Sequence, residues 1–269
     1  MTLSTPLLTV ENLTVTLYGR RDTEPRTILN DVSFHLQQGR ILGIVGESGS
    51  GKSTLGLALM RLLPDAMQDT GQIILSGADI SERPARYLRA LRGRSISLIG
   101  QEPMRALNPA MRIGQHIGES LRAHTASTSA QRAEKVRDLM QATGLTAAGV
   151  RPDAFPHALS GGQRQRVLIA AAIACEPDLL IADEFSTALD PATKEGIINL
   201  LLDLRTRTGM SIIMISHDLG MILRHADTVL VLRDGEVVEQ ASARDVLLHP
   251  RHAYTRALRD LSLALTPRP

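Results

Sequence analysis

The sequence predicts an α/β fold with a mainly parallel core sheet, an antiparallel β part and an inserted helical lobe. Short, continuous apolar runs such as ILGIV (41–45), LLIAD (179–183) and SIIMIS (211–216) are typical of strands buried on both faces of a parallel sheet. Helical stretches alternate with these runs, which favours parallel α/β architecture. A middle section, from about Met111 to Met140, has no strand pattern, and this predicts a lobe of helices inserted into the sheet domain.

Length and composition allow a sizeable core and exclude several classes of protein. The 269 residues are 43% hydrophobic and 22% charged, which is ordinary for a globular chain. Aromatic residues make up only 2%, and the net charge is only +2, so base-stacking platforms and a clustered basic face for nucleic acid are not expected. No apolar run is long enough to span a bilayer, and the first residues do not form a signal peptide. We therefore expect a soluble chain that works at a membrane only through a partner.

The chain has one cysteine, Cys175, within the apolar run VLIAAAIAC. One cysteine cannot build a disulfide, a zinc site or an iron–sulfur cluster by itself. We expect Cys175 to be a small buried hydrophobic residue.

The N-terminal third predicts strands followed by a strand–loop–helix unit. LLTVENLTVTLY and VSFHL alternate as antiparallel strands with one wet face. ILGIV then feeds a Gly-rich turn and a helix from about Ser53 to Leu63, and GQIILSG and SISLIG are further strands. The basic run RPARYLRALRGR is expected to be a solvated helix face.

The rest of the chain predicts the helical lobe and the completion of the sheet. Apolar residues recur at helical spacing at Ile113, Ile117 and Leu121, and again at Val136, Leu139 and Met140. From Gln163 onward, helices alternate with the strands LLIAD and SIIMIS. DTVLVLRDGEVVEQ predicts a hairpin around Asp234-Gly235, and SARDVLLH and AYTRALRDLSLAL predict closing helices.

GESGSGKST matches the G-x-x-x-x-G-K-[ST] pattern of a phosphate-binding loop at Gly46, Gly51, Lys52 and Ser53. Glycines let backbone N–H groups curl around phosphate oxygens, the lysine neutralises the β/γ region, and the serine hydroxyl can bind Mg²⁺. The alternative is a flexible Gly/Ser turn. The buried strand before the motif and the helix after it favour phosphate binding.

LLIADE places Asp183 and Glu184 at the end of a buried strand. Ligands of open α/β folds bind at this edge, where Asp183 can hold Mg²⁺ through water and Glu184 can activate an attacking water. On its own, the pair would more often begin a capped helix. The phosphate loop reverses that preference.

Three further polar residues are candidates at strand or helix ends. Gln101 follows SISLIG and can sense Mg²⁺ or the attacking water, and His217 follows SIIMIS and can donate to a γ-phosphate oxygen. Either could equally be an ordinary loop residue. Asp190 precedes a proline at a predicted helix start, and its alternative role is an N-cap.

HALSGGQRQRV raises a separate question. Ser160 and Gln163 form a capping box, but Gly161 and Gly162 are poor helix formers. A helix N-terminus with bare N–H groups attracts anions, although the chain already has a phosphate loop.

The ordered set of GESGSGKST, Gln101, LSGGQ, LLIADE, TALD and ISHD resembles the nucleotide-binding subunit of ABC transporters over nearly the whole chain. The resemblance implies a single domain over 1–269. It has a RecA-like core with an antiparallel β part at about 1–100 and 163–240, a helical subdomain at about 104–160 and a C-terminal helical extension at about 241–269. It also implies ATP and Mg²⁺ as ligands, and a head-to-tail pair of such domains.

The resemblance assigns roles to individual residues. ATP would be held by the phosphate loop, and its adenine would stack on Tyr18, although family spacing would equally select Leu17. Mg²⁺ would be held by Ser53, Gln101 and Asp183, and catalysis would rest on Glu184, His217 and Gln101. Asp190 would communicate between the two sites. The remaining nucleotide contacts fall into two sets: Gly46, Ser48, Gly49, Ser50, Gly51, Lys52, Ser53 and Thr54 toward this chain's own ATP, and Ser160, Gly161, Gly162 and Gln163 toward the ATP of the opposite domain.

Two stretches resemble a narrower group, the importers for dipeptides, oligopeptides and nickel. These are QEPMRALNPAMRIGQHI and the C-terminal HPRHAYTRAL. The LLPDAMQDTGQI segment resembles the first ATPase chain of the pair in such importers. The implied partners are a second, different ATPase subunit, two transmembrane permeases and, indirectly, an external solute-binding protein. The implied location is the cytoplasmic face of the cell (inner) membrane.

The chain departs from the family pattern at two places. Phe185-Ser186 follow Glu184 where Pro-Thr is usual, and Gly100 replaces an aromatic residue before Gln101. No catalytic group is lost, so an active ATPase is expected. The alternatives are a non-transport ABC ATPase, for instance in a carbon–phosphorus lyase assembly, and a phosphate-loop kinase or GTPase.

Overall fold

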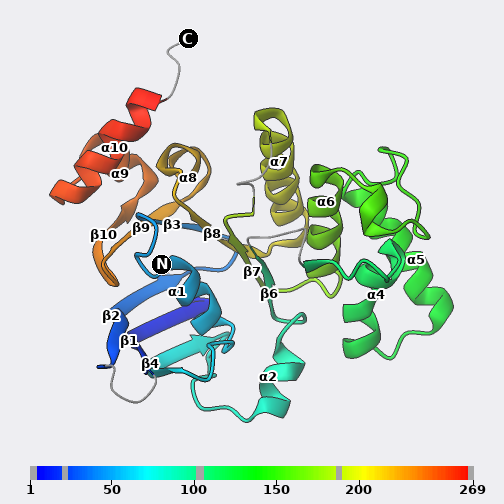
Figure 1. Cartoon of the computed structure of the whole chain (residues 1–269), viewed down its shortest axis with the longest axis horizontal. Helices are drawn as coiled ribbons and strands as arrows, with labels where there is room; N and C mark the ends of the chain where they lie inside the picture. The colour runs from blue at the N-terminus through cyan, green and yellow to red at the C-terminus, as the bar shows by residue number, and fades with distance from the viewer. Residues whose placement is uncertain (1–4, 20–23, 101–105, 186–189, 266–269) are drawn as a thin grey trace. The chain divides into compact units, whose positions relative to one another are not determined.

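The computed structural model describes residues 5–19, 24–100, 106–185 and 190–265 (Figure 1). The chain forms two compact units, one of residues 1–88 and 211–269 and the other of residues 89–210.

The first unit contains an antiparallel sheet in the order β2-β1-β4-β5. Its strands are β1 (Leu8–Leu17), β2 (Arg26–Leu36), β4 (Met67–Leu75) and β5 (Ala78–Asp79). Leu8, Val10, Leu13 and Val15 are buried along β1, so the prediction of a one-sided strand is confirmed. Asn12 has a φ of 51° where the register shifts, which is typical of a β-bulge.

The same unit holds strands in the order β10-β9-β3-β8. They are β3 (Ile41–Val45), β8 (Ser211–Ser216), β9 (Thr228–Arg233) and β10 (Glu236–Ser242). β3 and β8 are buried throughout, and β3 is parallel to both β8 and β9, as the continuous apolar runs predicted. Asp234 and Gly235 both have positive φ, which confirms the predicted hairpin turn between β9 and β10.

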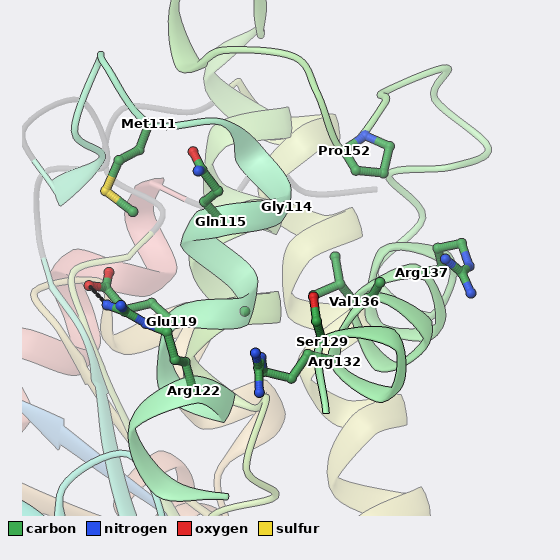
Figure 2. A pocket seen from close by; sticks show the side chains of 12 residues that line it. Met111, Gly114, Gln115, Glu119, Arg122, Ser129, Arg132, Val136, Arg137 and Pro152 are labelled. Atoms are coloured by element: carbon green, nitrogen blue, oxygen red, sulfur yellow. Dashed lines mark ion pairs between the residues drawn. The ribbon is translucent and has the colours of Figure 1, made fainter. Parts of the chain in front are cut away.

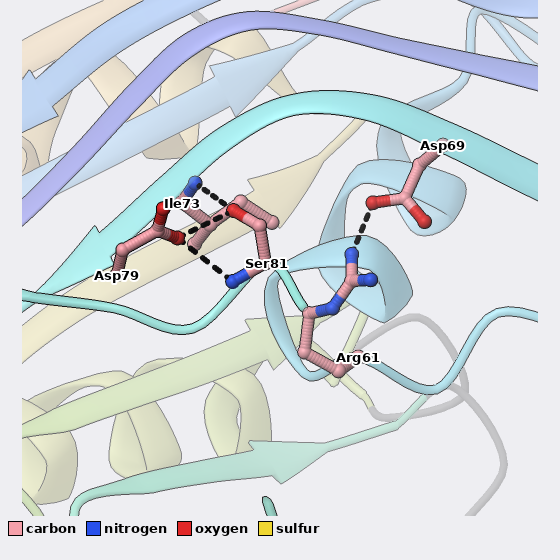
Figure 3. A network of polar contacts seen from close by, with 5 residues as sticks. All are labelled: Arg61, Asp69, Ile73, Asp79 and Ser81. Carbon is pink, nitrogen blue, oxygen red and sulfur yellow. Dashed lines mark hydrogen bonds and ion pairs between the residues drawn. The ribbon is translucent and has the colours of Figure 1, made fainter. Parts of the chain in front are cut away.

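Helix α1 (Lys52–Leu59) is shorter than predicted. We expected it to reach about Leu63, but Arg61 has a φ of 53° and its N–H donates to the carbonyl of Ala58. This left-handed residue ends the helix because an L-residue cannot continue a right-handed helix from it. The Arg61 guanidinium then pairs with the Asp69 carboxylate on β4, where the two side chains are 17% and 15% exposed (Figure 3).

Three helices complete the first unit: α8 (Leu219–His225), α9 (Ala243–Leu248) and α10 (Ala253–Leu265). α8 packs on β3, and α10 packs on α8, α9 and β10. The predicted closing helices are therefore confirmed, and they lie against β9 and β10.

The second unit contains the parallel pair β6 (Ile96–Ile99) and β7 (Leu179–Asp183), together with four longer helices. The helices are α4 (Ile113–His124), α5 (Ser129–Ala142), α6 (Gly161–Ala172) and α7 (Pro191–Thr208). The buried faces of α4 and α5 carry the residues that the helical spacing selected. A short helix, α2 (Ala85–Leu91), crosses the boundary between the units and buries only Leu88, in line with a solvated face.

The exposure of Cys175 and the character of the helices both bear on predictions from the sequence. Cys175 is partly exposed and lines a cavity of about 480 Å³ in the second unit, so the prediction of a buried cysteine was wrong. Cys175 lies three residues beyond the end of α6 at Ala172, where it faces this cavity together with the charged residues Arg94 and Glu176. Over the described ranges, none of the helices combines the length and apolarity that crossing a membrane requires.

Candidate functional site

The phosphate loop connects buried strand β3 to helix α1 in the first unit. Lys52 is only 5% exposed, and its Nζ donates to the carbonyl oxygens of Gly46 (2.9 Å) and Glu47 (2.7 Å). The lysine ammonium is thus held inside the loop beside the N-terminus of α1. The first N–H groups of a helix have no acceptor within the helix, so this end of α1 presents donors and a positive dipole end.

Two glycines of the loop are required by close approach. A Cβ on Gly46 would lie 2.1 Å from the Leu232 carbonyl oxygen, and one on Gly51 would lie 2.6 Å from Leu29 Cδ2. Gly51 also has a φ of 99°, which side chains rarely adopt. The loop is therefore packed against β9 and β2, and its shape depends on bare backbone at these two positions.

The hairpin turn between β9 and β10 also supports the loop. The Gly235 N–H donates to the Ser50 carbonyl oxygen at 3.2 Å, and the Asn30 N–H donates to the Gly235 carbonyl oxygen at 2.9 Å. Ser50 is only 4% exposed. The predicted DG turn thus has a second role, which the sequence did not reveal, as a support beneath the phosphate loop.

His217 leaves the sheet at the same edge as the phosphate loop. Val45 at the end of β3 pairs with Ser216 at the end of β8 in a parallel ladder. Neighbouring strands are about 4.8 Å apart, so Gly46 and His217 begin next to each other at the carboxyl edge. His217 is exposed there, as a ligand-facing residue needs to be. The structure thus brings together two of the predicted elements of the site.

Tyr18 follows β1 in the same unit and is 46% exposed. Its backbone N–H donates to the Ala66 carbonyl oxygen at 2.8 Å, which fixes the backbone at the end of the strand. The ring is therefore accessible to a flat ligand, and its choice over Leu17 stays a prediction.

In the second unit, Asp183 ends β7 and Glu184 leaves it. Asp183 is 8% exposed, and Glu184 has a φ of 43°. Within the described residues, Glu184 and Phe185 lie in a bend and a turn, and the next helix of the described part of the chain is α7 from Pro191. A left-handed backbone at a bulky residue costs about 1–2 kcal/mol, and such strain concentrates at functional sites. Phe185, which replaces the usual proline, is 2% exposed and anchors the chain beyond Glu184.

The LSGGQ segment forms the N-terminus of α6, and the predicted capping box is present. The Gln163 N–H donates to Ser160 Oγ at 3.3 Å, and the Ser160 N–H donates to Gln163 Oε1 at 2.9 Å. Gly161 is exposed at the helix start. A Cβ on Gly162 would lie 2.6 Å from Thr193 Cγ2 on α7, so this glycine also has an intramolecular reason to be bare.

Asp190 is the N-cap of α7. Its carboxylate accepts from the Thr193 N–H at 3.0 Å and from the Thr193 hydroxyl at 2.6 Å. The Thr193 hydroxyl and backbone hydrogen bonds together hold the pKa of Asp190 below its ordinary value. Thr193 therefore contacts both the Asp190 cap and Gly162. No short motif in the sequence marks this link.

Gln101 and Ser186 lie outside the described residues. Across the part of the chain that is described, no three His, Cys, Asp or Glu side chains are grouped so that they could hold a metal ion. A divalent metal at this site would thus need ligands such as the Ser53 hydroxyl, a carboxylate and phosphate oxygens, which is how Mg²⁺ is commonly bound with nucleotides.

The helical part of the second unit has a cavity of about 510 Å³ between α4 and α5. Figure 2 shows Arg122 on α4 beside Glu119, with which it forms an ion pair at 3.8 Å, and Arg132 on α5. Met111 and Pro152 lie at opposite sides of the cavity (Figure 2). The rim is therefore basic, and part of the lining is apolar.

Comparisons with known proteins identify the family of the chain. Residues 29–187 match the family model of the ABC transporter. The chain is 44% identical to the peptidoglycan transport ATP-binding protein YejF of Agrobacterium fabrum over 94% of this chain, but spans only 46% of that protein. It is 40% identical to the dipeptide transport ATP-binding protein DppD of Haemophilus influenzae, over 94% of this chain and 76% of that one.

Solved structures show the same fold. The ATP-binding cassette MJ0796, in a dimeric post-hydrolysis state bound to ADP and Pi, has a TM-score of 0.76 and 26% identity. The match covers 88% of this chain and 99% of that one. With the phosphate loop, the capped LSGGQ helix and the family match in agreement, the chain belongs to the ABC transporter family as one of its ATP-binding, ATP-hydrolysing subunits.

Proposed function

We propose that the chain hydrolyses Mg-ATP to drive uptake of di- or oligopeptides through partner permeases at the cytoplasmic face of the cell (inner) membrane. The observation that carries the proposal is the pair of helix N-termini, one holding Lys52 inside a phosphate loop and one capped by Ser160 in LSGGQ. The first suits this chain's own nucleotide, and the second is available to the nucleotide of a second ATPase chain.

The phosphate loop has the donors that a triphosphate requires. Lys52 would exchange the carbonyl oxygens of Gly46 and Glu47 for β- and γ-phosphate oxygens, and the N-terminal amides of α1 would donate to the same phosphates. Mg²⁺ would be held by the Ser53 hydroxyl, with Asp183 and Gln101 as further oxygen ligands, because hydroxyl, carboxylate and amide oxygens are the ligands that this ion takes beside nucleotide phosphates. When bound, Mg²⁺ neutralises charge on the phosphates.

Glu184 would accept a proton from the attacking water, which is a contribution of about 10²–10⁴-fold for a general base. Its left-handed backbone would aim the carboxylate away from the sheet, while buried Phe185 anchors the turn. His217 would donate to a γ-phosphate oxygen from the carboxyl edge of β8. Tyr18 would stack on the adenine.

A second ATPase chain would complete the site. Ser160, Gly161, Gly162 and Gln163 would cover the ATP held by that chain, and Asp190 would transmit the state of one site to the other. Binding of two ATP molecules would then stabilise the closed pair, because shared nucleotide contacts exist only in that state. Hydrolysis would remove these contacts and reopen the pair.

The permeases would dock on the helical part of the second unit. The cavity between α4 and α5 suits a short cytoplasmic helix of the permease that carries an acidic residue and an apolar face. Arg122, whose side chain is 73% exposed, would exchange its partner Glu119 for the acid, and Met111 would contact the apolar face. Relatives named for dipeptide and oligopeptide transport favour peptides over the nickel chelates that the sequence resemblance also allows.

The test is transport by the purified complex in liposomes, with a labelled tripeptide and the external binding protein. We expect ATP-dependent uptake in wild type and none in Glu184→Gln. Glu195→Gln, an exposed residue of α7, is the matched control and should transport normally. Purification of the chain in a soluble lyase complex, or uptake without ATP, would overturn the proposal.

A further inference from the structure

The C-terminal stretch HPRHAYTRAL has no role in the mechanism above, yet it reaches the phosphate loop. Tyr254, near the start of α10, is 8% exposed, and its hydroxyl oxygen accepts a hydrogen bond from the Glu47 N–H at 2.9 Å. Glu47 is the second residue of the phosphate loop. A residue 207 positions away along the chain thus holds the backbone of that loop.

We infer that Tyr254 is a positioning residue of the phosphate loop, through which the C-terminal helix keeps the loop in its nucleotide-binding shape. The expected effect of Tyr254 on ATP binding rests on the proposed function, whereas the hydrogen bond between Tyr254 and Glu47 does not.

Both backbone hydrogen-bonding groups of Glu47 are occupied. Its N–H donates to Tyr254, and its carbonyl oxygen accepts from Lys52 Nζ at 2.7 Å and from the Ser50 N–H at 3.2 Å. When Lys52 turns toward phosphate, one of the bonds to the carbonyl is lost. The bond from Tyr254 does not involve Lys52, so it can persist through that change and keep Glu47 in place.

The phenol is suited to this position. Arg233 at the end of β9 lies over its ring, with the guanidinium carbon 5.0 Å from the ring centroid. Burial raises the pKa of Tyr254, and the nearby Glu47 carboxylate raises it further against the opposing effect of the Glu47 N–H. The hydroxyl therefore stays protonated at neutral pH.

The start of α10 is itself anchored to the sheet. The Glu239 carboxylate on β10 accepts from the backbone N–H groups of Arg251 and His252, each at 2.9 Å. The Tyr254 N–H donates to His252 Nδ1 at 3.2 Å. Glu239 is 8% exposed, so these charge-assisted bonds are shielded from water. Tyr254 is thus presented from a fixed turn, as a positioning role requires.

The test is Tyr254→Phe in the full chain, because phenylalanine keeps the ring and its contact with Arg233 and removes only the hydroxyl. Tyr87→Phe is the matched control, since Arg83 lies over the Tyr87 ring at 5.2 Å. The first readout is hydrogen exchange of the Glu47 amide without nucleotide. We expect exchange to be roughly two- to tenfold faster in Tyr254→Phe, from the loss of one hydrogen bond, and unchanged in Tyr87→Phe.

The second readout is steady-state ATP hydrolysis. A loop that is less often in its binding shape raises the apparent KM for ATP by roughly two- to tenfold and leaves kcat near the wild-type value. Unchanged exchange at Glu47, or a fall in kcat at constant KM, would overturn the inference. Absence of hydrolysis by wild type would instead count against the proposed function, while the exchange readout would still decide the role of Tyr254.

Discussion

Gly162→Ala is expected to destabilise the fold through one identifiable methyl group. The added Cβ would lie 2.6 Å from Thr193 Cγ2, whereas carbon atoms in contact are about 3.5–4.0 Å apart. Helix α6 or Thr193 must therefore move by about 1 Å. The Thr193 side chain cannot simply rotate away, because its χ1 is restricted and its hydroxyl donates to Asp190 at 2.6 Å.

Two opposing contributions determine how much Gly162→Ala changes the free energy of unfolding. Overpacking costs about 1–3 kcal/mol, and alanine in place of glycine within a helix returns up to about 0.8–1.0 kcal/mol. We expect Gly162→Ala to lower the free energy of unfolding by about 1 kcal/mol, with an upper value near 2.

Thr193→Ser supplies the decisive background, because it removes Cγ2 and keeps the hydroxyl that bonds to Asp190. In this background Gly162→Ala should be neutral or stabilising, which corresponds to a coupling of about 1–3 kcal/mol between the two substitutions. The coupling is measured by urea unfolding of four proteins: the wild type, Gly162→Ala, Thr193→Ser and the double variant. The comparison requires that their m values be equal. Gly196→Ala on α7 is the control, since its Cβ would find only an ordinary contact at 3.5 Å, and it should stabilise.

Equal effects of Gly162→Ala in the wild-type and Thr193→Ser backgrounds would refute this reasoning. The bare backbone at Gly162 would then be explained by nucleotide approach alone, and the contact between α6 and α7 would carry no energetic weight.

Three further results are expected. Burial raises the pKa of Glu239, but the hydrogen bonds from Arg251 and His252 outweigh it, so the folded-state pKa lies below the ordinary value. The carboxylate then stabilises the fold above about pH 4.3, and this contribution is lost as pH falls through the folded-state pKa. Glu239→Gln should therefore lower the free energy of unfolding by about 1–3 kcal/mol at pH 7, and by progressively less in acid. A difference between this variant and wild type that does not change with pH in urea titrations would contradict this. Cys175 is partly exposed, but its partial burial still raises the pKa of its thiol. Iodoacetamide should therefore alkylate Cys175 more slowly than it alkylates glutathione at pH 7.4, and an equal or faster rate would count against that environment. Arg122→Glu should reduce peptide uptake by the complex without changing ATP hydrolysis by the isolated chain. Arg207→Glu is the control and should change neither, because Arg207 on α7 is similarly exposed and ion-paired. Equal uptake by the two variants would contradict the proposed permease contact.

Local patterns predicted the elements that local physics determines. The buried runs became β3, β7 and β8, and Asp234-Gly235 formed the expected turn, because strand burial and turn conformation depend on neighbouring residues. The capping box at Ser160 was equally local and is present.

Features that depend on distant partners were not predictable from the sequence. Helix α1 ends early at the left-handed Arg61, whose side chain pairs with Asp69 on β4. The contacts of Tyr254 with Glu47 and of Gly235 with Ser50 join segments that are far apart along the chain. No periodicity or short motif encodes such pairs, because they arise from how the strands and helices pack.

The central claim is that Ser160 acts on a nucleotide held by another chain, and Ser160→Arg tests it most directly. Thr128→Arg is the matched control, because Thr128 is the cap of α5 in an equivalent capping box with Gln131. Both substitutions remove a cap worth about 1 kcal/mol. We predict that Ser160→Arg keeps ATP binding to this chain's own phosphate loop and lowers hydrolysis by about 10²-fold or more, while Thr128→Arg hydrolyses ATP normally. Normal hydrolysis by Ser160→Arg would contradict the account and leave LSGGQ as a capped helix start alone.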